Sequence, residues 1–207
     1  MTHNTFIYIL VQVTSKITSK RTIFKTLEFA GVLCRCPFEN SPHYNKWLAV
    51  KETRNRGWWL PAGALESGET FLDGAKRECW EEAHMKIDLK GILKIDHKVD
   101  LNDSGRMRVV FYAEPTDIEA AHDFKTPAMA DKESVEARWV TLQELKEITS
   151  KENCSKTGDR LRGDELFVWA DYLESGGQVF PLELVSLREG YGLDPKNHRA
   201  FEIFVNN

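Results

Sequence analysis

The chain has 207 residues, of which 42% are hydrophobic and 29% are charged, and its formal net charge at pH 7 is -4. This composition is typical of a folded globular protein and excludes disorder as the dominant state, and the length suits one domain with an extension. Because the net charge is negative, we expect no stable nucleic acid complex, although bound cations would still allow a small phosphorylated ligand.

The longest apolar run, residues 6–13, stands near the start of the chain. It is far shorter than the ~20 residues that cross a bilayer as a helix, and no basic residue precedes it as in a secretory signal. β-branched and aromatic residues dominate this run and residues 27–34, so both predict strands. The four cysteines form no CxxC pair and no half of a zinc site. We therefore expect a cytoplasmic protein that does not associate with membranes.

Further strand patterns lead up to the clearest helix pattern. Residues 46–50 alternate between apolar and polar types and predict a third strand. A basic loop that contains glycine, residues 53–57, separates it from a segment that ends as a strand at Trp59 and Leu60. Pro61 and Gly63 then turn the chain.

The clearest helix is expected from Thr70 to Ala83. Thr70 is the candidate N-cap, and no proline interrupts the segment. Its apolar residues recur at spacings of three and four and are Leu72, Ala75, Cys79 and Ala83. Because several of them are small, we expect this helix to approach a sheet closely.

Strand patterns resume after this helix. Residues 87–99 and 106–113 predict the two strands of an antiparallel hairpin, because a strong turn signal, residues 102–105, lies between them. Residues 115–134 have the character of a long loop, and loops of that length in compact domains are usually functional or mobile. Residues 135–140 then predict another strand.

Two helix patterns and a weak strand pattern follow. Thr141 and Glu144 have the spacing of a capping box for a short helix that reaches about Ile148. Residues 159–173 predict a second helix, which ends at a Ser-Gly-Gly sequence. Residues 179–185 have the pattern of an added strand.

These elements divide the chain into three regions. Residues 1–26 are expected to form an N-terminal strand and linker, and residues 27–175 the main domain. Residues 176–207 are expected to be a C-terminal extension that packs on the domain, although the patterning of residues 188–207 indicates no element. The sequence does not distinguish a monomer from a homodimer.

Three carboxylates of the predicted helix lie close together. Glu78, Glu81 and Glu82 stand at positions i, i+3 and i+4, which places them within an arc of about 100° on one helix face. Like charges at this spacing repel one another, and a divalent cation would offset the repulsion. Carboxylate oxygens without nearby His or Cys favour Mg²⁺ or Mn²⁺. The alternative is an ordinary solvated helix face.

The region around this helix resembles the box of the Nudix hydrolase family. In that box a glycine is followed, at fixed spacings, by Glu, Arg-Glu, an apolar residue, Glu-Glu, a glycine and an apolar residue. This chain supplies Gly63, Glu69, Arg77, Glu78, Cys79, Glu81, Glu82 and Met85 at those places. His84 stands where the family has its second glycine. A left-handed residue there is easiest for glycine, and histidine is one of the more tolerated alternatives, so the sequence leaves the geometry of this helix end open.

The resemblance implies a fold and a set of roles. The fold is α/β, an α/β/α sandwich around a mixed β-sheet. Glu78 and Glu82 would bind the metal, and Glu81 would be a further ligand or the group that activates water. The carbonyl oxygen of Gly63 is a candidate additional ligand. Arg77 would orient Glu69 and Glu78 by charge-assisted hydrogen bonds, and its alternative is an i,i+4 ion pair with Glu81.

A further acid is expected outside the box. Many family members carry a catalytic or metal-binding acid on the loop before a strand that ends in an apolar-Trp pattern. Here Glu133 precedes Trp139 and Val140 and is the first candidate, with Glu136 as the second. The alternative is that both are simply solvated.

Shorter segments resemble the eukaryotic Nudix type 18 group, whose members hydrolyse oxidised guanine nucleoside diphosphates. These segments are residues 58–63, 107–111, 131–134 and 161–166. In that group a purine would stack on an aromatic side chain, and Trp58 and Phe111 are the candidates, with Arg108 near a phosphate. The alternative for Phe111 is a core residue of its strand.

The function expected from this resemblance is a Mg²⁺- or Mn²⁺-dependent hydrolase of a phosphoanhydride bond in a nucleoside diphosphate derivative. Oxidised guanine nucleoside diphosphates are the first candidate substrates, and the products would be a monophosphate and phosphate. The alternatives are dinucleoside polyphosphates, ADP-ribose or nucleotide sugars, and least of all diphosphoinositol phosphates, which need a denser basic cluster. A non-catalytic nucleotide-binding module of the same fold is the alternative from another class.

Overall fold

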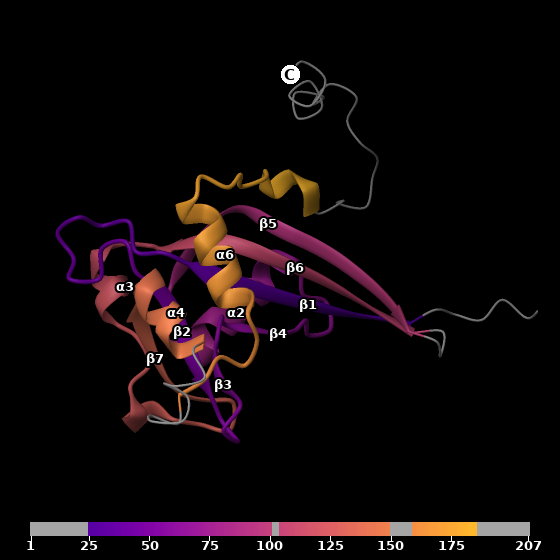
Figure 1. The fold of residues 1–207 in the computed structure, drawn as a ribbon. Coiled ribbons are helices and arrows are strands. Elements are labelled where there is room, and N and C mark those ends of the chain that lie inside the picture. Colours follow the sequence, from indigo (N-terminus) through magenta and orange to yellow (C-terminus); the bar gives the residue numbers. More distant parts are fainter. Residues whose placement is uncertain (1–24, 101–103, 150–158, 186–207) are drawn as a thin grey trace, which may run out of the picture.

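The structure is a computed structural model, and we describe residues 25–100, 104–149 and 159–185 of it (Figure 1). The expected strand at 6–13, Cys154 and the segment 188–207 lie outside these residues. In chain order the elements are β1 (Lys25–Cys34), β2 (Trp47–Glu52), β3 (Gly57–Trp59), β4 (Ala62–Ala64), α2 (Phe71–Ala83), β5 (Ile87–Asp100), β6 (Ser104–Pro115), α3 (Ile118–His122), η1 (Pro127–Met129), β7 (Ser134–Val140), α4 (Leu142–Thr149), α6 (Glu165–Glu174) and η2 (Leu182–Val185). No helix among these is long and apolar enough to cross a membrane.

The strands form two sheets. One has the order β4-β1-β6-β5 and the other β3-β2-β7. β1 and β6 run parallel, whereas all the other pairs are antiparallel. The larger sheet is therefore mixed, and the expected hairpin of residues 87–99 and 106–113 is confirmed as β5 and β6.

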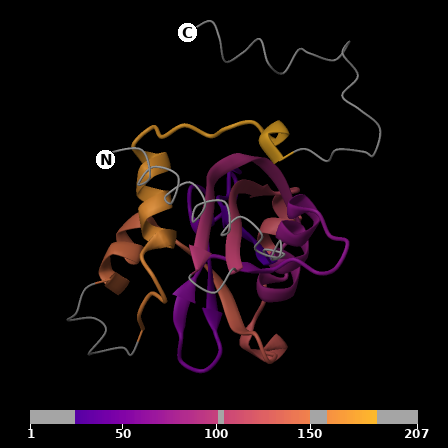
Figure 2. The same cartoon turned by 90° about the vertical axis from the view of Figure 1, so that its right-hand side faces the viewer.

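Helices cover the strands from two sides, which confirms the expected sandwich (Figure 2). The strands alternate between two core clusters, so that Val32 and Leu48 contribute to one cluster while their neighbours Leu33 and Ala49 contribute to the other. α2 packs into the first cluster through Ala75, Cys79 and Ala83. α4 and α6 pack into the second through Leu145, Leu166 and Ala170. Because both faces are covered, large apolar side chains point to both sides of these strands.

Both ends of α2 are capped. The hydroxyl oxygen of Thr70 accepts a hydrogen bond from the backbone N–H of Asp73 at 3.1 Å, as an N-cap does. His84 has φ 52° and ψ 37°, the left-handed conformation expected at the glycine position. Its ring lies 3.9 Å from the ring of Trp80, centroid to centroid.

Three expected segments differ from the structure, in addition to the start of the second C-terminal helix, which is described below. The segment 115–134, expected as a loop, contains α3 and η1. Residues 62–64, expected only to turn the chain, form β4 on the edge of β1. In the segment expected as strand 179–185, Phe180 alone makes a β-bridge, with Ile92, and Leu182–Val185 is a 3-10 helix.

The second C-terminal helix starts later than predicted, at Glu165 instead of residue 159. The reason is a tertiary contact: Trp58 donates its backbone N–H to the carbonyl of Arg160 at 2.8 Å, and its carbonyl accepts from the N–H of Arg162 at 2.9 Å. These two bonds hold residues 160–162 extended along the edge of β3. The helix ends near the predicted Ser-Gly-Gly sequence, with Ser175 as its C-cap.

Candidate active site

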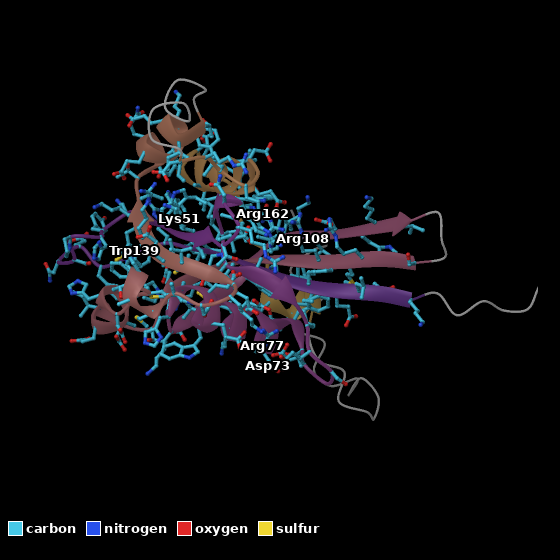
Figure 3. All side chains as sticks on the ribbon, turned by 90° about the horizontal axis from the view of Figure 1, so that it is seen from below. Lys51, Asp73, Arg77, Arg108, Trp139 and Arg162 are labelled. Atoms are coloured by element: carbon cyan, nitrogen blue, oxygen red, sulfur yellow. The ribbon has the colours of Figure 1, made fainter. Side chains whose placement is uncertain are left out.

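A pocket of about 780 Å³ lies where α2, β4 and the end of β2 meet. Figure 3 shows Arg77 on α2 on one side of the strand layer and Arg162 on the other, and both line this pocket. The pocket therefore reaches from α2 across the edge of the strands to the segment before α6. One group of lining residues comes from β4 and α2 and comprises Gly63, Arg77, Glu78, Glu81 and Glu82. A second group comprises Glu52, Arg54, Arg56, Lys132, Glu133 and Arg162.

The three predicted helix carboxylates are brought together, but with different exposure. Glu78 and Glu82 are buried at 7% and 6% of their accessible surface, whereas the side chain of Glu81 is 43% exposed. Glu82 accepts a hydrogen bond from the backbone N–H of Ala62 at 2.9 Å. The packing of α2 against β4 thus buries two of the acids at the base of the pocket.

Gly63 allows this close packing. A Cβ atom at this position would lie 2.1 Å from Oε1 of Glu78 and 2.5 Å from Oε2. The carboxylate of Glu78 therefore lies directly against the Gly63 backbone. Any side chain at position 63 would displace it, which explains in physical terms why this place in the pattern holds a glycine.

Arg77 forms hydrogen bonds to three acidic side chains beside the pocket, those of Glu69, Glu78 and Glu81. It binds Glu69 with two hydrogen bonds, from Nε at 2.6 Å and Nη2 at 2.9 Å. Its Nη1 donates to Glu78 at 2.7 Å and to Glu81 at 2.8 Å, and its Nη2 donates to the carbonyl of Ala64 at 2.9 Å. Both roles considered for Arg77, the orienting contacts and the i,i+4 pair, are present together. These hydrogen bonds lower the pKa of Glu69.

The burial of Glu78 and Glu82 disfavours the ionised form of both side chains. The pKa of Glu82 is raised to about 8: burial is the main cause, the charges of Glu78, Glu52 and Glu133 add to it, and the hydrogen bond from Ala62 opposes it. Burial also raises the pKa of Glu78, although Arg77 opposes this effect. Ionisation of both carboxyls would therefore place negative charge that their partners do not neutralise, and a bound cation would favour the ionised form.

The donor set at the base of the pocket fits a hard divalent cation. Carboxylate oxygens of Glu78 and Glu82 adjoin the Gly63 backbone, and no His or Cys side chain lines the pocket. Within the described residues, no three His, Cys, Asp or Glu side chains already converge as a metal site. In this arrangement the carboxylates of Glu78 and Glu81 are hydrogen-bonded to the guanidinium group of Arg77.

Glu133 lies at the rim of the same pocket. Its side chain is 45% exposed, and its backbone N–H donates to the carboxylate of Asp131 at 2.8 Å. Its charge contributes to the raised pKa values of both Glu78 and Glu82. Glu136, the second candidate, instead lies 3.7 Å from Lys51 on the neighbouring strand and does not line the pocket.

The three residues expected to contact the substrate, Trp58, Arg108 and Phe111, are not among the residues that line this pocket. Trp58 and Phe111 are 1% and 0% exposed, and each belongs to one of the two core clusters. Arg108 is held by the carboxylates of Asp96 and Glu165. Because both faces of the strands are covered, an aromatic side chain on them is more often a core residue than a stacking surface. The core alternative considered for Phe111 agrees with this burial.

Two pocket residues were not expected from the sequence. Glu52, at the end of β2, is buried and forms an ion pair with Arg162. The guanidinium of Arg162 lies 4.1 Å from the ring centroid of Trp59, within the range of a cation–π contact. The segment around Arg162 belongs to the quoted resemblance, but nothing in the local pattern links it to Glu52. Their contact depends on the extended pairing of residues 160–162 with β3.

Comparisons with known proteins agree with this geometry. A family model described as the NUDIX domain matches residues 35–158. The 8-oxo-dGDP phosphatase NUDT18 of Homo sapiens is 35% identical over 95 residues, which are 44% of this chain and 27% of that protein. The phosphatase NudJ of Escherichia coli is 28% identical over 103 residues, which are 48% of this chain and 63% of that protein.

Solved structures resemble the fold. A NUDIX hydrolase from Nitrosomonas europaea superposes with a TM-score of 0.55 at 20% identity, covering 81% of this chain and 100% of that one. A UDP-X diphosphatase has a TM-score of 0.50 at 16% identity, covering 83% and 73%. At these identities the likeness concerns the fold alone. In sequence, this chain matches only about a quarter of the length of the human relative.

Proposed function

The chain belongs to the NUDIX family, and on this premise we propose that it is a Mg²⁺- or Mn²⁺-dependent hydrolase of a phosphoanhydride bond in a nucleoside diphosphate derivative. The observation that carries this proposal is the wall formed by Gly63, Glu78, Glu81 and Glu82. It combines carboxyl oxygens, whose ionisation a bound cation would favour, with a pocket large enough for a nucleotide.

Glu78 and Glu82 would hold the metal, with Glu81 and the carbonyl of Gly63 as further ligands. When bound, the metal would neutralise charge on the phosphate oxygens and make water a better nucleophile. Arg77 keeps Glu78 and Glu81 at the wall through its hydrogen bonds. Water adds to one phosphorus and the bridging P–O bond breaks. Glu81 or Glu133, both partly exposed in the pocket, then accepts the proton that water loses.

The basic side chains in the second group of pocket residues support a substrate with several negative charges. Arg54, Arg56, Lys132 and Arg162 all line the pocket and offer hydrogen-bond donors to phosphate oxygens. We place phosphates between these cations and the helix carboxylates. Phosphoryl transfer depends mainly on such positioning and charge neutralisation.

For the identity of the substrate, we propose an oxidised guanine nucleoside diphosphate, hydrolysed to the monophosphate and phosphate. The similarity to a relative named as an 8-oxo-dGDP phosphatase, 35% identical over 95 residues, supports this choice. Dinucleoside polyphosphates, ADP-ribose and nucleotide sugars remain the enzymatic alternatives. A binding module without turnover is the alternative from another class.

The test is a competitive turnover screen with Mg²⁺ or Mn²⁺. It would include normal and oxidised nucleoside di- and triphosphates, ADP-ribose and dinucleoside polyphosphates, with free phosphate and nucleotide products measured. We expect Glu82→Gln to lower kcat by about 100-fold or more, and chelation of the metal to abolish turnover. Glu119→Gln, an exposed residue of α3, is the matched control.

Two results would contradict the proposal. Turnover that survives Glu82→Gln would show that these carboxylates do not carry the reaction. Nucleotide binding by the wild type, measured by calorimetry, without release of any product would instead identify a binding module.

A further inference from the structure

A buried lysine lies behind the wall of the pocket. Lys125, in the segment between α3 and β7, is 3% exposed. Its ammonium group donates to the carbonyl of Glu81 at 3.0 Å, to the hydroxyl of Ser134 at 2.6 Å and to the carboxylate of Asp131. An ammonium group has three N–H donors, so each of them has one partner here.

One of these partners, the carbonyl of Glu81, belongs to the last turn of α2. Lys125 binds the carbonyl of Glu81 directly, and Ser134 passes the contact on by donating its hydroxyl to the carbonyl of Glu82 at 2.9 Å. The last turn of α2 contains no basic residue of its own. Lys125 therefore supplies the positive charge that the carbonyl end of a helix favours, at the two residues whose side chains enter the pocket.

The same ammonium group also fixes the loop that carries Glu133. One carboxylate oxygen of Asp131 accepts from Lys125, while the other accepts from the backbone N–H groups of Glu133 at 2.8 Å and Ser134 at 3.0 Å. Although partial burial opposes it, these hydrogen bonds lower the pKa of Asp131 to about 2. Asp131 is thus ionised at neutral pH and holds the backbone on either side of Glu133.

We propose that Lys125 is a positioning residue for hydrolysis, which fixes the loop of Glu133 against the end of α2 that carries Glu81 and Glu82. The inference rests on the proposed function, because it assigns a use to that arrangement of acids. The backbone of Lys125 already joins the two parts, since its N–H donates to Ala83 at 2.8 Å and its carbonyl accepts from Ala137 at 2.8 Å. An apolar side chain would therefore keep the chain path, and the ammonium adds the contacts to Glu81, Ser134 and Asp131.

The experiment compares Lys125→Met, Asp131→Asn and the double variant with the wild type. Methionine fills a similar volume without donors, and the exposed Lys76→Met on α2 is the matched control. Asp131→Asn leaves a buried ammonium without its anionic partner and should destabilise the fold. The double variant removes both charges, so it should recover the stability that Asp131→Asn loses. The double variant does not restore the hydrogen bonds through which Lys125 connects the end of α2 to the loop of Glu133.

Turnover and Mn²⁺ binding then separate the two possible roles. A positioning role predicts that Lys125→Met and the double variant both lose kcat by about 10- to 100-fold, with KM within about twofold and weaker Mn²⁺ binding by electron paramagnetic resonance. If the folded double variant has the kcat and Mn²⁺ affinity of the wild type, Lys125 serves only to neutralise Asp131 and the proposal is wrong.

Hydrogen exchange keeps this test independent of the proposed function. Lys125→Met should speed exchange of the Glu133 and Ser134 amides and should leave β5 unchanged. If the wild type turns over no nucleotide, the proposed function fails, but hydrogen exchange and Mn²⁺ binding still test whether Lys125 fixes the Glu133 loop against α2. Unchanged exchange in 131–134 would overturn the proposal even in an active enzyme.

Discussion

Removing the charge of Glu82 should stabilise the metal-free protein, and more so as the pH rises. In the unfolded chain this carboxyl titrates near 4.5, whereas in the folded protein its pKa is raised to about 8. A group with a raised pKa binds its proton more tightly in the folded state. The contribution of the Glu82 carboxyl to folding stability is therefore complete below pH 4.5 and is lost as the pH rises toward 8. Glu82→Gln removes this loss and keeps an oxygen that can accept from Ala62.

The size of the effect follows from the pKa difference. At pH 7.5 the wild-type protein must protonate Glu82 when it folds. The pH is then about three units above the pKa of this carboxyl in the unfolded chain, and each unit costs 1.36 kcal/mol, so the total cost is about 4 kcal/mol. Relaxation and water entry around the charge reduce this figure, so we expect a gain of about 2–4 kcal/mol for Glu82→Gln. For a chain of this size this corresponds to roughly 5–15 °C in Tm.

The assay is thermal unfolding by circular dichroism from pH 4.5 to 8.5, with chelator present. The two Tm curves should meet near pH 4.5 and separate as the pH rises, while Glu119→Gln follows the wild type throughout. Added Mg²⁺ or Mn²⁺ should raise the Tm of the wild type more than that of Glu82→Gln. Curves that stay parallel over the whole pH range would refute the electrostatic account of this site.

Three further substitutions test other parts of the structure. Gly63→Ala should lower kcat by about 10- to 100-fold and change unfolding free energy by less than about 1 kcal/mol, because its Cβ collides with the movable end of Glu78; equal turnover would contradict this. Arg77→Lys should lower both kcat and Tm, since one ammonium cannot replace the forked contacts, and unchanged values would argue against their importance. Gly91→Ala should cost about 1–3 kcal/mol in urea unfolding, because its Cβ would lie 2.5 Å from the carbonyl oxygen of Phe180; an unchanged midpoint would show that this contact yields freely.

The local features of the fold were predictable from the sequence. The cap at Thr70 and the capping box of Thr141 and Glu144 both depend on residues within one helical turn of each other. The grouping of Glu78, Glu81 and Glu82 depends only on helical spacing. Such features survive in the structure because no distant contact competes with them.

Features that depend on distant contacts were not predictable. The helix expected from residue 159 begins later because Arg160 and Arg162 pair with Trp58, about 100 positions earlier in the chain. The burial of Trp58 and Phe111 follows from helices that cover both faces of the strands, and residue type alone does not reveal this. Lys125 has the appearance of an ordinary loop lysine until the fold places three acceptors around it.

The parallel pairing of β1 with β6 has a consequence for how the molecule is made. It pairs Lys25 with Ser104, so the whole segment between them must be synthesised before these strands can meet. Closing so large a loop costs entropy, and topologies of high contact order fold slowly. β4 and α2 are neighbours in the chain and can associate early, whereas Arg162 reaches Glu52 only after the later segments have formed. The pocket is therefore completed only after Lys132 and Arg162, its basic residues from the later part of the chain, have been synthesised.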